Sequence, residues 1–147
     1  MDAVESVDIL LVEDNPQDVE LTIRALKKRN LANSVYVLSD GAEALDYMFN
    51  RGRYEKADSN QRPKVVLLDV KLPKMNGLEV LRILKENEAT RSVPVVMVTS
   101  SSEDPDIRAA YQFGANSYVV KPVDFDAFVE AMSSLGFYWL LINHATA

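Results

Sequence analysis

Hydrophobic positions fall into five short runs, and each run is followed by a longer segment in which apolar residues recur at helical spacing. The runs are rich in valine, leucine and isoleucine, which is typical of parallel strands covered on both faces. They lie at residues 7–12, 35–38, 65–68, 95–98 and 117–120. Five strand-helix units without an internal repeat predict an α/β fold, a three-layer doubly wound parallel sheet.

Residue preferences at helix starts show where the helical segments begin. Asn15 followed by Pro16 predicts a helix that ends near residue 29, because this pair suits a cap and a first turn. Leucines alternate with charged residues at 78–85, which predicts an amphipathic helix there. Each of the other three helices is expected to start at an aspartate, at positions 40, 104 and 124.

Periodicity also separates buried positions from surface positions. In the helix that starts near residue 104, Ile107, Ala110 and Tyr111 form the expected buried stripe, and Gly114 the expected end. The segment 50–62 has almost no periodicity and much charge. We therefore expect it to be a surface loop, longer than most connections in compact domains.

Composition excludes several classes of protein. The 147 residues suit one domain, expected to span 1–147 with a core at about 7–142. A net charge of -6 argues against nucleic acid as a partner. The chain has no cysteine for disulfides or thiolate metal sites, and a single histidine, His144, excludes a histidine-based triad. Without a signal-peptide pattern or an apolar segment of membrane-spanning length, the expected location is the cytoplasm, with no membrane partner.

Candidate site residues follow four of the five predicted strands. Glu13 and Asp14 follow the first, Asp69 the third, Thr99 the fourth and Lys121 the fifth. Because the carboxyl ends of parallel strands lie along one edge, these side chains are expected to converge where α/β sheets bind ligands. Three neighbouring carboxylates repel one another, and Mg²⁺ relieves that repulsion through oxygen ligands, with Mn²⁺ as the alternative. With an amine beside the metal, the residues predict a phosphoryl site.

At these residues the chain resembles the receiver domain of two-component response regulators. The resemblance implies a flavodoxin-like (βα)5 fold with strand order 2-1-3-4-5 and a signalling phosphoprotein instead of a conventional enzyme. It implies that Asp69 accepts a phosphoryl group from a sensor histidine kinase, and that Glu13, Asp14, Asp69 and the backbone carbonyl of Lys71 hold Mg²⁺. It rests on four motifs in order: LLVEDNPQD, LLDVKLPKMNGLEVL, VMVTSS and GANSYVVKPV.

The same resemblance assigns further roles near the phosphoacceptor. Thr99 and Lys121 would contact the phosphoryl oxygens, and Tyr118 would be the aromatic residue whose side-chain position reports the phosphorylation state. Many relatives carry a smaller side chain where this chain has Lys71. Lys71 and Ser101 are therefore expected to tune the rate of dephosphorylation.

Two other functions fit parts of the pattern. A phosphohydrolase of the haloacid dehalogenase type also uses a strand-end aspartate, but it needs a second acid two residues later, where this chain has Lys71. A pseudo-receiver adaptor would keep the fold without phosphorylation, and the complete set of acids, Thr99 and Lys121 argues against it.

The last predicted helix carries more apolar residues than one buried face can hold. Such an excess suits a protein interface, although the tail could instead fold back over its own domain. The ending and the 50–62 insertion resemble the single-domain response regulators of bacterial and cyanobacterial phytochrome kinases. We therefore predict a homodimer through the face of helix four, strand five and helix five. The residues expected in the interface are Phe137, Tyr138, Leu140 and Leu141.

Overall fold

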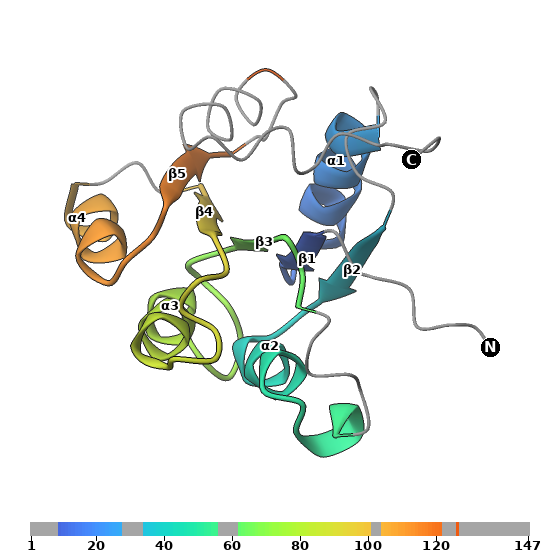
Figure 1. The fold of residues 1–147 in the computed structure, drawn as a ribbon. Coiled ribbons are helices and arrows are strands. Elements are labelled where there is room, and N and C mark those ends of the chain that lie inside the picture. Colours follow the sequence, from blue (N-terminus) through green and yellow to red (C-terminus); the bar gives the residue numbers. More distant parts are fainter. Residues whose placement is uncertain (1–8, 28–33, 56–61, 101–103, 122–125, 127–147) are drawn as a thin grey trace, which may run out of the picture.

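A single parallel sheet forms the centre of the protein (Figure 1). The computed structural model describes residues 9–27, 34–55, 62–100, 104–121 and 126. The strand order is β2-β1-β3-β4-β5, which confirms the predicted doubly wound, flavodoxin-like topology. The strands are β1 (Ile9–Val12), β2 (Val35–Leu38), β3 (Val65–Leu68), β4 (Val95–Thr99) and β5 (Ser117–Val120).

Within the described residues, four α-helices lie on the two faces of the sheet (Figure 1). Helix α1 (Pro16–Lys27) covers one face, and α2 (Gly41–Met48), α3 (Gly77–Glu86) and α4 (Asp104–Gln112) lie on the other. None of these helices has the length and apolar character needed to cross a membrane, within the described part of the chain. Apart from residue 126, the fifth predicted helix lies outside the described residues, as do residues 7 and 8 of the first predicted strand.

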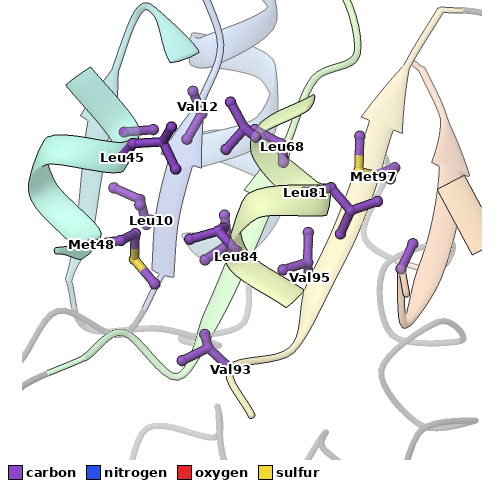
Figure 2. Packing of buried hydrophobic residues seen from close by; sticks show 14 of the residues in the cluster. Leu10, Val12, Leu45, Met48, Leu68, Leu81, Leu84, Val93, Val95 and Met97 are labelled. Carbon is purple, nitrogen blue, oxygen red and sulfur yellow. The ribbon is translucent and has the colours of Figure 1, made fainter. Parts of the chain in front are cut away.

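The consecutive apolar positions of the strands supply two cores. In β1, Leu10 and Val12 pack against α2 and α3, whereas Ile9 and Leu11 join Leu26 of α1 on the opposite face. Figure 2 shows the larger core, in which side chains of α2 and α3 meet those of β1, β3 and β4. Burying an aliphatic or aromatic side chain of this size contributes about 1.5–3 kcal/mol. Burial on both faces is why these strands show runs of apolar residues instead of alternation.

Side-chain caps begin two of the helices where the sequence predicts them. The Oδ1 atom of Asn15 accepts hydrogen bonds from the backbone N–H groups of Gln17 and Asp18, at 2.9 and 3.1 Å. At α2, Oδ1 of Asp40 accepts from the N–H of Glu43 at 2.7 Å. Each cap satisfies N–H groups that have no partner inside the helix. The cap at Asn15 also fixes the first turn of α1 next to the end of β1.

One expectation about a buried position is wrong, and the predicted surface loop contains a short turn that the sequence analysis did not predict. Tyr111 is 50% exposed, because the buried side of α4 runs through Ala110 while Phe113 packs against the core from beyond the helix. Part of the predicted loop, Gly52–Tyr54, forms a 3-10 turn. It places the ring of Tyr54 against Tyr36 and Tyr47, with centroid distances of 6.3 and 5.2 Å.

Hydrogen bonds hold this turn to α2. The Tyr54 hydroxyl donates to Oε2 of Glu43 at 3.1 Å and accepts from Arg53 at 2.7 Å. A single tyrosine among charged residues carries no periodic signal, which is why the sequence pattern did not reveal the contact.

Candidate functional site

Acidic side chains meet at the carboxyl edge of the sheet. Glu13 and Asp14 directly follow β1, and Asp69 directly follows β3, which pairs with β1 in parallel register. Each of the three offers a carboxylate oxygen, and these oxygens all lie within 4.8 Å of one another. Glu13 and Asp69 are 3% and 6% exposed, whereas Asp14 is exposed. This is an all-oxygen donor set of the kind that suits a hard divalent cation.

Lys121, which follows β5, contacts three acids at once. Its Nζ lies 2.7 Å from Oε1 of Glu13, 2.9 Å from Oδ2 of Asp18 and 3.2 Å from Oδ2 of Asp69. Burial disfavours the charged ammonium group, but the hydrogen bonds to Glu13 and Asp18 and the charge of Asp69 outweigh it and raise the pKa of Lys121. Burial also raises the pKa of the Glu13 carboxyl, against the opposing hydrogen bond from Lys121.

Asp18 is a member of this group that the sequence analysis missed. It lies in the first turn of α1, where an acid is expected simply because it interacts well with the helix dipole. The signal that could have revealed it is its position three residues after the Asn15 cap, which directs the first turn of α1 toward the same edge as the strand-end acids.

The other predicted site residues are distributed around this centre. Thr99 is the last residue of β4, and its backbone pairs with Val120 of β5. Tyr118 is partly buried in β5 and packs against the larger core. Lys71 is exposed in the loop after Asp69. Ser101 and the four predicted interface residues, Phe137, Tyr138, Leu140 and Leu141, lie outside the described residues.

Close backbone contacts fix the loop that carries Asp69. A Cβ atom at Gly77 would lie 1.8 Å from the carbonyl oxygen of Asp69, and the N–H of Gly77 donates to the carbonyl of Val70 at 2.7 Å. A Cβ atom at Gly41 would lie 2.3 Å from the carbonyl oxygen of Met75. Real Cβ atoms do not approach other atoms this closely, so only glycine fits at either position. The position of Asp69 is therefore set by backbone packing on both sides of its loop.

The fold and the acidic cluster are both consistent with one protein family. Residues 9–133 match the family model of the response regulator receiver domain, and the chain therefore belongs to the receiver domains of two-component response regulators. Its similarity extends to response regulators of phytochrome systems. The bacteriophytochrome response regulator AtBRR shares 51% sequence identity and a TM-score of 0.83, covering 96% of this chain and 100% of that one.

Two further relatives differ more in sequence. The Mn²⁺-bound form of response regulator Rcp1, a protein of Synechocystis, is 33% identical with a TM-score of 0.76, covering 93% of this chain and 97% of that one. A probable methanogenesis regulatory protein, FilR2 of Methanothrix harundinacea, is 39% identical, covering 98% of this chain and 92% of that protein. The predicted resemblance to receiver domains is thus confirmed.

Proposed function

We propose that this receiver domain is a phosphorylatable switch, in which Asp69 accepts a phosphoryl group from a sensor histidine kinase. The observation that carries the proposal is the setting of Asp69: a nearly buried carboxylate 3.2 Å from the ammonium group of Lys121 and beside two further acids. A free carboxylate oxygen of Asp69 attacks the phosphorus of the donor, and the donor group leaves with the bonding electrons. Lys121 then pairs with an oxygen of the transferred group.

The acidic cluster fits a divalent cation, because its three acids are close together and all its ligand atoms are oxygens. We propose that Glu13, Asp14, Asp69 and the backbone carbonyl of Lys71 hold Mg²⁺, or Mn²⁺ in its place. The bound cation would supply positive charge that offsets the charge of the phosphoryl oxygens. The Mn²⁺-bound form of the related Rcp1 supports this proposal.

Four nearby residues are proposed to set how the site responds. Thr99 and Tyr118 would act together as the switch, with the Thr99 hydroxyl bonding a phosphoryl oxygen. Lys71 and Ser101, two residues after Asp69 and Thr99 respectively, would tune access of the water that hydrolyses the phosphoryl group. The exposed position of Lys71 in the loop after Asp69 agrees with that role.

Incubation with acetyl phosphate and Mg²⁺, followed by intact-protein mass spectrometry, tests the proposed function. A switch accumulates one labile phosphate. Rapid consumption of acetyl phosphate without a stable adduct would instead indicate a phosphohydrolase of the haloacid dehalogenase type. No adduct and no turnover would indicate a pseudo-receiver adaptor, and either of these outcomes would overturn the proposal.

Replacement of Asp14 by alanine is expected to weaken Mg²⁺ binding and phosphorylation together. The exposed carboxylate supplies both a ligand and a negative charge, and its loss should lower Mg²⁺ affinity by about tenfold or more. Calorimetric titration with MgCl2 measures the affinity, and acetyl phosphate labelling measures the rate. An unchanged Mg²⁺ affinity would show that Asp14 is not a ligand.

The kinase is one proposed partner, and a second copy of the chain is the other. Similarity to phytochrome response regulators supports a phytochrome kinase as the phosphoryl donor. It also supports a location in the cytoplasm, where ATP is available to such a kinase. The apolar excess of the C-terminal sequence supports a homodimer through the face of α4, β5 and the predicted fifth helix.

Sedimentation velocity tests the dimer. We expect the parent to dimerise at tens of micromolar, and a Phe137→Glu, Leu141→Glu variant to remain monomeric because charges in an apolar interface are costly to bury. A parent that stays monomeric with and without acetyl phosphate would refute the dimer.

A further inference from the structure

The ammonium group of Lys121 uses all three of its hydrogens on carboxylates. An ammonium group can donate three hydrogen bonds, and the acceptors are Glu13, Asp18 and Asp69 at 2.7, 2.9 and 3.2 Å. Two of these acceptors, Glu13 and Asp69, also belong to the cluster proposed to hold a divalent cation, together with Asp14. Asp18 is not a member of that cluster. A cation at the cluster and the ammonium group of Lys121 therefore compete for the same two carboxylates.

Because of this competition, the contact between Lys121 and Asp18 becomes the one that can remain when a cation binds. Lys121 has to loosen its contacts with Glu13 and Asp69 when a cation takes up their oxygens, because positive charges this close repel one another. The Lys121 side chain is only 12% exposed, so water cannot fully replace the lost acceptors and an unpaired charge there would be costly. The bond to Asp18 needs no oxygen that the cation uses. The cap at Asn15, which accepts the N–H of Asp18 at 3.1 Å, fixes the backbone that carries it.

We propose that Asp18 is a positioning residue for Lys121, the carboxylate that retains the ammonium group when a divalent cation takes over Glu13 and Asp69. With one hydrogen still donated to Asp18, the other two are released beside the cation. They are then available to the oxygens of an anion on Asp69. This last consequence rests on the proposed function, whereas the exchange between cation and ammonium group does not.

The test is the Mg²⁺ affinity of an Asp18→Asn variant, measured by calorimetric titration with MgCl2. Without the charge of Asp18, Lys121 binds Glu13 and Asp69 more tightly, and Mg²⁺ affinity should fall about threefold. Glu20→Gln is the matched control, because it makes the same charge change in α1 at a side chain that is 68% exposed and pairs with Arg24. It should change the affinity less than about 1.5-fold.

Two further variants distinguish positioning from general charge or fold effects. In a Lys121→Met background the competitor is absent, so Asp18→Asn should lower Mg²⁺ affinity no more than Glu20→Gln does in that background. Asp18→Glu keeps the charge and should restore most of the affinity of the parent. Urea unfolding of each variant, followed by circular dichroism, confirms that the folded protein is titrated.

Three results would overturn the inference. The first is that Asp18→Asn and Glu20→Gln lower the Mg²⁺ affinity equally. The second is that Asp18→Asn lowers the Mg²⁺ affinity by the same factor in the Lys121→Met background as in the parent. The third is that the parent binds no Mg²⁺. Because titration with MgCl2 involves no phosphoryl donor, a parent that binds Mg²⁺ but takes no phosphate would overturn the proposed function alone.

Discussion

Replacement of Asp69 by asparagine is expected to abolish phosphorylation by acetyl phosphate and by the kinase. The amide keeps the size and shape of the carboxylate, but it lacks the negatively charged oxygen that attacks phosphorus. One of the three acceptors of Lys121 becomes neutral, while the bonds to Glu13 and Asp18 remain. We therefore expect the free energy of unfolding to change by only about 1 kcal/mol, which is small for a folded domain.

Intact-protein mass spectrometry after incubation with acetyl phosphate and Mg²⁺ measures the loss. Asp46→Asn serves as the control, because Asp46 is a surface aspartate of α2 that pairs with Arg51 at 3.5 Å, outside the acidic cluster. The control should be labelled as fast as the parent. An Asp69→Asn protein that still gains one phosphate would require another acceptor and would refute the assignment.

Replacement of Gly77 by alanine is expected to cause the largest loss of stability among single changes near the site. The new Cβ would lie 1.8 Å from the carbonyl oxygen of Asp69, which is a backbone atom and cannot rotate away. Either the start of α3 or the end of β3 has to shift, at the expense of core packing. We expect the free energy of unfolding to fall by about 3 kcal/mol, as for other overpacked positions.

Urea unfolding followed by circular dichroism measures this effect, with Gly52→Ala as the comparison. Gly52 has a φ of 57°, but the nearest atom to its added Cβ is a side-chain oxygen of Asp46 at 3.4 Å. It should therefore lose only about 1 kcal/mol, from backbone strain alone. If the two variants lose equal stability, the close approach at Gly77 is not the controlling feature.

The parallel sheet and the strand-end acids could be predicted from sequence because they depend on strong local patterns, whereas the strand order was implied by the resemblance to receiver domains. Runs such as residues 65–68 are apolar at every position only when helices cover both faces, and parallel connections place all carboxyl ends on one edge. Polar residues directly after such runs must therefore lie along that edge. This argument brings Glu13, Asp14 and Asp69 together without any knowledge of side-chain geometry.

Contacts that depend on the tilt of a helix or on an isolated side chain could not be predicted from the sequence. Asp18 lies in the first turn of α1 and reaches Lys121 directly after the end of β5, but an acid at that position of a helix already has a local explanation. Tyr54 packs against Tyr36 and Tyr47, but it lies in a charged segment that has no hydrophobic periodicity. Tyr111 fits a helical stripe in α4, but the buried position is its neighbour Ala110.

The fixed loop between Asp69 and Gly77 has a consequence for how such proteins can diverge. Glycines 41 and 77 hold the backbone of the loop, whereas the side chains of Lys71 and Lys74 on it are exposed. Substitutions at these two exposed positions can accumulate without moving the carboxylate of Asp69, while substitutions at either glycine displace a neighbouring backbone segment. Natural selection, or a designer, can therefore alter the surroundings of the phosphoacceptor one side chain at a time on an unchanged backbone.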